Sequence, residues 1–141
     1  MANTWVFQAN PKAYLVDEAL RSVNEHTWLV NQHRKQVHAG DRVFIWKCGP
    51  EAGLVGVGIV LTDPAYIEAR PEERKFEKQP LKFDGKRWRV RVKTERLKVP
   101  ILRKNMLSDS VLKSWRVVKG WQGTNSPVSS DIEIAIEKML S

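Results

Sequence analysis

The tryptophans are the side chains of this sequence with the clearest capacity for recognition chemistry, because a flat aromatic ring can stack on a flat ligand. Six occur in 141 residues. Trp28 follows polar residues at what reads as the entrance of a helix, and Trp46 ends an apolar strand beside Lys47. Aromatic rings in such places near a basic surface commonly stack on nucleobases. Trp28 and Trp46 are therefore candidate base-stacking residues, with packing in the core as the alternative for each.

The other tryptophans are expected to be structural. Trp5, Trp88 and Trp115 fall at inward positions of predicted strands or helices, which is typical of core residues. Trp121 stands in a predicted loop, where it would be a lid or a packing anchor.

Groups that would support catalysis show no recognisable arrangement in the sequence. Cys48, the single cysteine, falls on an apolar strand face with no assigned base, as a buried and unreactive thiol would. Glu72 and Glu73 stand among arginines, where solvated charges are the simpler interpretation. The histidines and the cysteine lack a metal-ligand spacing, and no phosphate-binding glycine motif precedes a helix. We therefore predict a protein that is not an enzyme, with no metal site and no cofactor.

Basic residues are concentrated in one quarter of the chain. The net charge is +8. Residues 70–104 contain 14 lysines and arginines against five acids, a net charge of +9, and the remaining 106 residues sum to −1. This distribution favours a surface that binds a polyanion over a merely solvated face.

The stretch 37–60 is expected to form the centre of the fold, as two strands joined by a glycine-rich turn. Alternate residues of 43–48 are mostly apolar on both sides, which predicts a central strand covered on both faces. The second strand, 54–61, carries Gly56 and Gly58 on one face, where a bulky neighbour must approach the backbone. A flat ligand could fill that slot, and so could a neighbouring helix or a tryptophan.

A second hairpin is predicted around Asp84–Gly85, between residues 81–83 and 88–97. Pro100 should end its second strand. The alternation in that strand puts Trp88, Val90, Val92 and Thr94 inward, and it puts Arg89, Arg91, Lys93 and Glu95 outward as a basic ladder on the solvent face.

Shorter elements complete the chain. The patterns predict a strand over 4–8, helices over 17–23 and 31–38, a polar excursion over 70–79, helices over 103–107 and 110–115, and a loop over 120–130. Ser130 and Glu133 form a capping-box pattern for a last helix.

Length and composition predict one domain, residues 1–141. A single cysteine rules out a disulfide framework and favours a reducing, cytoplasmic setting. The sequence shows neither a signal-peptide pattern nor a run of 18 apolar residues, so no membrane partner is expected.

Five segments in order along the chain resemble the EVE domain family. They are WVFQANP at 5–11, the Trp28 segment with NQHR at 31–34, GDRVFIWKCG at 40–49, AGLVGVGIV at 52–60 and QGTNSPVS at 122–129. The resemblance implies an α/β (α+β) fold of the PUA-like type, a small mixed β-barrel of about five or six strands surrounded by short helices. EVE domains are similar to YTH domains, which hold a methylated RNA base in an aromatic pocket. The resemblance therefore implies a reader of modified nucleobases, which in several relatives is modified cytosine in DNA.

Carried over residue by residue, the resemblance also implies a site. The base pocket would take Gln8, Ala9, Asn10, Trp28, Trp46, Lys47, Cys48, Gly49, Thr124, Asn125 and Ser126. Asn10 and Asn125 would supply amides able to read a Watson–Crick edge. Phosphates are expected on the basic residues Arg34, Lys86, Arg87, Arg89, Arg91 and Lys93. A further cage aromatic comes from a later segment in YTH domains, and the sequence does not locate it here.

The predicted function is capture of a flipped-out modified base, with DNA favoured over RNA and 5-methylcytosine as the expected modification. One alternative is a non-catalytic RNA-binding module for tRNA or rRNA. Another is an enzyme accessory that binds a nucleotide-like small molecule. The modification, the polymer, the sequence context, the oligomeric state and any partner enzyme stay open.

Overall fold

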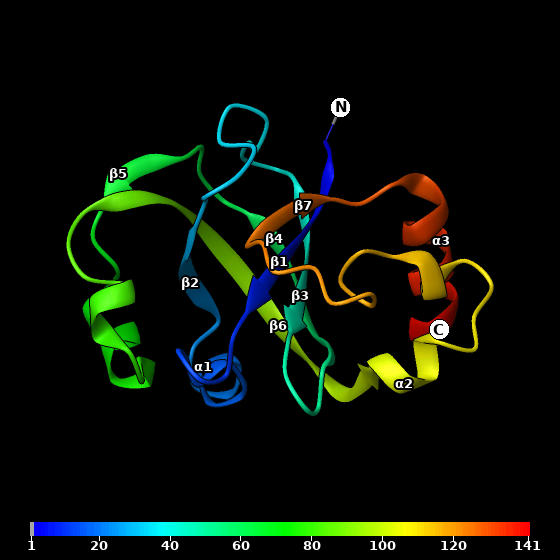
Figure 1. The fold of residues 1–141 in the computed structure, drawn as a ribbon. Coiled ribbons are helices and arrows are strands. Elements are labelled where there is room, and N and C mark those ends of the chain that lie inside the picture. The colour runs from blue at the N-terminus through cyan, green and yellow to red at the C-terminus, as the bar shows by residue number, and fades with distance from the viewer. Residues whose placement is uncertain (1) are drawn as a thin grey trace.

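A curled, mixed β-sheet of seven strands forms the frame of the protein, in a computed structural model that describes residues 2–141 (Figure 1). The strand order is β2-β6-β4-β3-β1-β7, and β5 pairs with β6. β1 and β3 are parallel, and the other pairs are antiparallel. The elements are β1 (Thr4–Ala9), α1 (Val16–Ser22), β2 (Glu25–Leu29), β3 (Arg42–Lys47), β4 (Gly53–Val60), β5 (Ala65–Ile67), η1 (Pro71–Phe76), η2 (Pro80–Lys82), β6 (Arg87–Leu102), α2 (Arg103–Met106), η3 (Leu112–Ser114), β7 (Asn125–Pro127) and α3 (Ser130–Leu140), where η marks a 3₁₀ helix. This architecture is the small PUA-like barrel that the resemblance implied.

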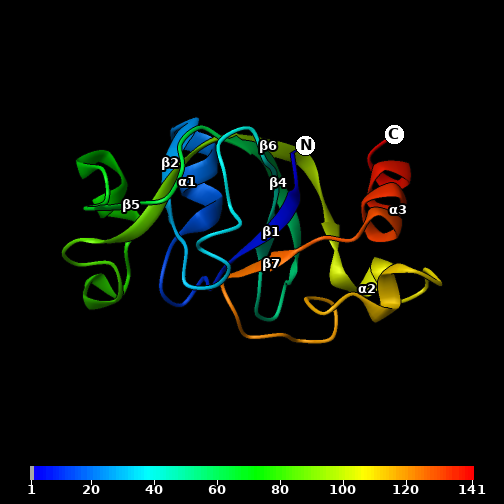
Figure 2. The same ribbon diagram turned by 90° about the horizontal axis from the view of Figure 1, so that it is seen from above.

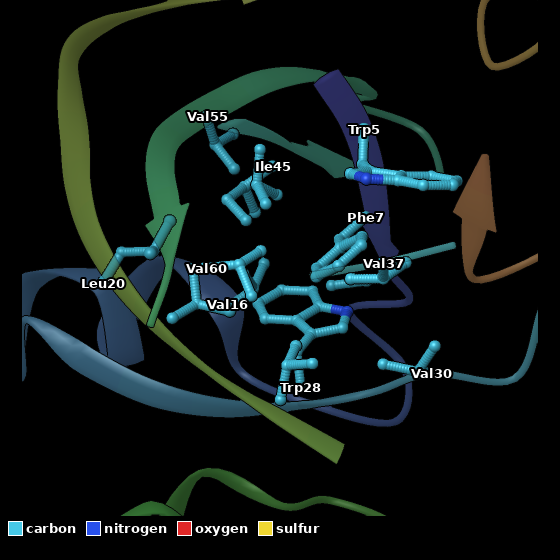
Figure 3. Packing of buried hydrophobic residues seen from close by; sticks show 14 residues of the cluster. Trp5, Phe7, Val16, Leu20, Trp28, Val30, Val37, Ile45, Val55 and Val60 are labelled. Atoms are coloured by element: carbon cyan, nitrogen blue, oxygen red, sulfur yellow. The ribbon is translucent and has the colours of Figure 1, made fainter. Parts of the chain in front are cut away.

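β3 is central and buried on both faces, as its alternation predicted. Val43 and Ile45 belong to the cluster that α1 covers, and Ile45 points into the curl of the sheet (Figure 3). Phe44 and Trp46 belong to a second cluster, together with Met106 of α2, Leu112 of η3 and Ile136 of α3. The elements α2 and α3 lie on the opposite side of the sheet from α1 (Figure 2). The protein therefore has two apolar clusters, one on each side of β3.

The slot beside the strand glycines is filled by protein. A Cβ atom on Gly56 would lie 3.1 Å from the Glu95 carbonyl oxygen and 3.3 Å from Leu20 Cδ1 of α1. A Cβ atom on Gly58 would lie 2.6 Å from the Lys93 carbonyl oxygen. These glycines permit close packing of β6 and α1 on β4, and they do not form a ligand site.

Two side-chain amides join β7 to β2, the two ends of the strand order; we call this contact the amide seam. Asn125 donates through Nδ2 to the Leu29 carbonyl oxygen at 2.9 Å, and its Oδ1 accepts the backbone N–H of Asn31 at 2.8 Å. Gln32 Oε1 accepts the backbone N–H groups of Thr124 at 2.8 Å and Asn125 at 3.0 Å. Side chains thus satisfy backbone groups that a strand ladder would otherwise pair.

The predicted hairpin around Asp84–Gly85 is wrong. Residues 80–82 form η2, and β6 pairs instead with β2, β4 and β5. Pro100 does not end the strand, because it lies within β6 where the register with β4 shifts and a ladder donor is not needed.

Several shorter elements also differ from the prediction. Turns replace the expected helix over 31–38. Trp28 lies within β2 and not at the entrance of a helix. Within 110–115 only η3 is helical, and the expected loop over 120–130 contains β7. The last helix begins one residue earlier than expected, with Ser129 at its cap. Among residues 2–141, no helix is long and apolar enough to cross a membrane.

Candidate functional site

A pocket of about 470 Å³ opens at one end of the barrel, between the end of β1, β2 and the segment that leads into β6. Its lining comes from five parts of the chain that are distant in sequence. These are residues 8–14, residues 26–31, Cys48, residues 69–89 and residues 122–124. A concave space of this size is typical of a small-molecule site.

Six of the eleven predicted pocket residues line this space: Gln8, Ala9, Asn10, Trp28, Cys48 and Thr124. Gln8 holds the neighbouring loop, because its Nε2 donates to the carbonyl oxygens of Trp121 at 2.9 Å and Gly123 at 2.7 Å. Asn10 Oδ1 accepts the Lys12 backbone N–H at 3.0 Å, which fixes the side-chain amide at the rim.

The other five predicted pocket residues do not line it. Trp46 is 1% exposed and packs against Trp115 in the second cluster, with ring centroids 5.6 Å apart. The alternation of β3 explains this position, since it sends Trp46 to the face opposite the barrel interior. The remaining four serve the fold: Lys47 pairs with Asp17, Gly49 adopts a positive φ at the turn beside Pro11, Asn125 belongs to the amide seam, and Ser126 is buried in β7.

Trp28 belongs mainly to the core. It is 8% exposed, and its ring points from β2 toward Phe7, with the ring centroids 6.0 Å apart (Figure 3). It reaches the pocket with only a small part of its surface. Base stacking by Trp28 therefore stays a prediction, and the residue also packs in the apolar core.

Two aromatic rings of the pocket were missed by the sequence reasoning. Tyr14 and Phe83 both line it, with ring centroids 5.6 Å apart. Phe83 follows η2, in a stretch interpreted as the first strand of a hairpin. An apolar ring just after the polar excursion was the available signal, and it also makes Phe83 a candidate for the cage aromatic that the sequence left unplaced.

Two carboxylates, Glu73 and Glu77, also line the pocket near Tyr14. Glu73 is 2% exposed and accepts hydrogen bonds from the Thr27 backbone N–H and hydroxyl, both at 2.6 Å. Burial raises the pKa of Glu73, and those hydrogen bonds oppose the shift. Burial, together with the Glu73 and Glu77 carboxylates, raises the pKa of Tyr14, so its phenol stays neutral.

Burial also shifts the pKa of two further groups of the lining, His26 and Cys48. Burial lowers the pKa of His26 and raises the pKa of Cys48. Cys48 therefore remains a thiol at neutral pH, the opposite of what a nucleophilic cysteine requires. Within the described part of the chain, no three His, Cys, Asp or Glu side chains gather as metal ligands.

Arg89 is not part of an outward basic ladder, so its predicted phosphate role is wrong. It is 1% exposed, and its guanidinium donates to the carbonyl oxygens of Ile67 at 2.5 Å, Phe83 at 2.6 Å and Gly85 at 3.1 Å. The segment 67–85 covers this end of β6 on the face that the alternation left to solvent. Arg89 therefore fastens that segment, and burial lowers its pKa.

The other predicted phosphate residues are exposed or half-buried. Arg34, Lys86 and Arg87 come together along a second hollow, which shares Asn31 and Arg87 with the pocket. Lys93 and Arg91 lie farther along β6, and Arg91 is paired with Glu25 at 2.6 Å. Of the cations that are not fully buried, Lys82 and Arg87 line the pocket itself, and Arg34 and Lys86 lie in the adjoining hollow.

Comparisons with known proteins identify the family and agree with the fold. The sequence model of the EVE domain family matches residues 3–139. The solved structures that the fold resembles include human THYN1 in complex with DNA containing 5-methylcytosine, with 14% identity, 99% of this chain and 98% of that chain covered and a TM-score of 0.68. A protein of Rhodopseudomonas palustris matches at 18% identity over 98% of this chain and 92% of that chain, with a TM-score of 0.69. A protein of Pseudomonas syringae matches at 16% identity over 98% and 99%, with a TM-score of 0.68. No curated protein matches the chain.

Proposed function

This chain belongs to the EVE domain family, and we propose that it binds nucleic acid and holds one modified, flipped-out base in the pocket at the end of the barrel. The pocket is the observation that carries the proposal. At about 470 Å³ it falls in the range of small-ligand sites, and rings of Tyr14, Trp28 and Phe83 contribute to its lining. Such a site suits a flat heterocycle.

DNA with 5-methylcytosine is the proposed ligand. Human THYN1 has been solved with DNA that contains this base, and this chain shares its fold over nearly the whole length of both proteins. The shared fold supports a common mode of binding. The choice of base depends on individual side chains, and the two proteins are 14% identical.

A base inside a duplex is stacked and paired, so it cannot enter a pocket there, and the mechanism includes base flipping or a single-stranded target. Phosphate contacts would supply most of the affinity and the pocket would supply the choice of base. Arg34, Lys86 and Arg87 lie beside the pocket and are the proposed phosphate-binding residues.

Preference for a methylated base should be modest. Burial of one methyl group contributes about 0.8 kcal/mol, which is about a fourfold preference. Contact between that methyl and an aromatic ring adds on the order of 1 kcal/mol. Together these give a preference of about 10- to 30-fold, unless a clash penalises the unmodified base.

Binding without catalysis is the proposed activity. The pocket holds a neutral thiol at Cys48 and a neutral imidazole at His26 rather than an activated nucleophile and its base. RNA is the alternative polymer, because a single-stranded RNA base would fit the same pocket. A free nucleotide-like molecule is the alternative ligand.

Direct binding measurements on matched oligonucleotides test the proposal. Single- and double-stranded DNA and RNA, each with cytosine or 5-methylcytosine at one position, are compared with 5-methyldeoxycytidine alone. We expect the methylated DNA to bind best. Equal affinity for methylated and unmethylated strands of both polymers would contradict it.

A variant of the pocket ties that preference to the site. Phe83→Ala removes a half-buried ring and should reduce the preference for the methylated base while binding to the unmethylated strand persists. Lys138→Gln on α3 serves as the control, because no residue of α3 lines the pocket and α3 lies on the opposite side of the sheet from α1 (Figure 2). Melting temperatures of both variants separate loss of the contact from loss of the fold.

A further inference from the structure

An exposed pair of aromatic side chains lies next to the pocket. Neither belongs to the two apolar clusters of the described residues. Tyr66 of β5 and Trp88 of β6 are directly opposite in the ladder, with ring centroids 5.6 Å apart. Tyr66 is 56% exposed and Trp88 is 38% exposed. Large rings gain most from burial, so two adjacent exposed rings indicate a binding surface.

A cation completes this surface. The Arg34 guanidinium carbon lies 4.2 Å from the centroid of the Trp88 ring, which is a cation–π contact. We call the surface formed by Tyr66, Trp88 and Arg34 the platform. It presents a phenol ring and a guanidinium plane to solvent, and nucleobases stack on both kinds of group.

The charged side chains around the platform are mainly positive, as binding of a phosphodiester requires. Lys35, Lys86 and Arg87 line the same hollow. The acid there, Asp84, is already paired with Arg74 at 3.1 Å. Arg87 is held by the carbonyl oxygens of Asp84 at 3.0 Å and Leu81 at 2.9 Å, and it lines both the hollow and the pocket.

We infer that the platform is a second nucleotide subsite, which stacks the base next to the one in the pocket. The proposal rests on the function proposed above and extends it from one nucleotide to two. Arg87 stands between the two spaces, where the phosphate that links neighbouring nucleotides would lie. The protein would then read a modified base within an unstacked strand and contact its neighbour without sequence preference.

Oligonucleotides with abasic neighbours test this inference, since they keep the phosphates and remove only the base. Short single strands carry 5-methylcytosine at the centre and an abasic site on the 5′ side, on the 3′ side, or on neither. For the unaltered protein, one of the two abasic strands should bind about 5- to 150-fold more weakly than the intact strand. Tyr66→Ala should weaken binding of the intact strand and abolish the difference between intact and abasic strands.

Two controls accompany the variant. Tyr66→Phe keeps the ring and should retain the abasic effect. Ile134→Ala truncates another exposed apolar residue, on α3, and should change nothing.

The outcomes separate the platform from the pocket. The preference for 5-methylcytosine over cytosine reports on the pocket, and Tyr66→Ala should leave that ratio unchanged. Two results would overturn the platform inference alone, provided that the preference for 5-methylcytosine is present. In the first, an abasic neighbour does not weaken binding. In the second, it weakens binding to Tyr66→Ala as much as to the unaltered protein. If the preference is absent while the neighbour effect depends on Tyr66, the platform is supported as a nucleotide-binding surface and the pocket proposal falls. Failure to bind any strand would overturn both.

Discussion

Trp28 and Trp88 show what alternation determines at a single residue and what it does not. Trp28 pairs with Val90 in the ladder and points into the barrel interior. Trp88 precedes Val90 by two residues, so the same pattern predicted a core position, yet it is 38% exposed. Period two assigns a residue to a face of the sheet, but it does not show where the core beneath that face ends.

The two tryptophans should therefore respond differently to truncation. Trp28→Ala should lower the free energy of unfolding by about 3–5 kcal/mol, because it empties a buried space. Trp88→Ala should cost less than about 1 kcal/mol. Chemical denaturation measures both values. Similar losses for the two variants would contradict the assignment of Trp28 to the core and Trp88 to the surface.

Arg89 and Lys86 are both basic, but Arg89 is buried and Lys86 is exposed, so we expect different effects when each is replaced. Arg89→Gln removes charged donors from buried carbonyl oxygens, so it should destabilise the protein by about 2–4 kcal/mol. Lys86→Gln should leave the melting temperature unchanged and lower the slope of log affinity against log salt by about one. A stable Arg89→Gln variant with a reduced salt slope would restore the phosphate role that we assign elsewhere.

His26 should make stability sensitive to mild acid. Its pKa in the folded protein is lowered from 6.5 by burial, so below that pH the unfolded chain takes up the proton first. The free energy of unfolding should therefore fall as the pH decreases from about 7 toward the lowered pKa. His26→Gln keeps a donor for the Val23 carbonyl oxygen and lacks this titration.

The comparison of the two proteins isolates the His26 contribution. Glu73 has the opposite effect on stability, because its pKa in the folded protein is raised, so the free energy of unfolding gains from Glu73 as the pH falls toward 4.5. Glu73 is present in both the unaltered protein and His26→Gln, so the comparison is made at equal Glu73 content. Urea denaturation across the pH range should show the stability of the unaltered protein falling relative to His26→Gln. Parallel curves would contradict the lowered pKa.

At the scale of elements, β1, α1, β3, β4 and the last helix could be predicted because each follows from its own pattern. Strong alternation and a glycine turn were enough for β3 and β4. β7 has three residues and was hidden in a loop rich in turn formers. The long β6 was predicted as a strand but with the wrong partner, because pairing depends on where distant strands lie.

The amide seam could not be predicted for the same reason. Asn125 is fully buried and bonds residues more than 90 positions away. The resemblance placed it in the pocket as a reader of the base, whereas its amide is occupied by backbone groups of residues 29–32.

Asn125→Ala should open this seam. Three backbone groups would lose their partner, which should cost about 2–4 kcal/mol of stability. Hydrogen exchange should accelerate at the amides of Asn31 and Gln32 more than at those of β3. Uniform acceleration throughout the chain would show that the seam is no weaker than the rest of the barrel.

At the scale of the molecule, the family resemblance predicted the fold well and the lining of the pocket only in part. The segments carried over from relatives come together at the end of the barrel where the pocket opens. Within each segment, however, the direction of a side chain decides whether it reaches the pocket, and this excluded Trp46 and Asn125. Tyr14, Phe83 and Tyr66 were missed because they become neighbours of the site only after the chain folds.

Photo-crosslinking tests the central claim, that the pocket holds a flipped-out base, most directly. A strand with 5-iodocytosine in place of 5-methylcytosine is irradiated in complex with the protein, and mass spectrometry locates the linked residue. We predict links to Tyr14, Trp28 or Phe83 when the iodinated base is central, and links to Tyr66 or Trp88 when it is the neighbour. Links from the central base only to residues outside the pocket would contradict the account.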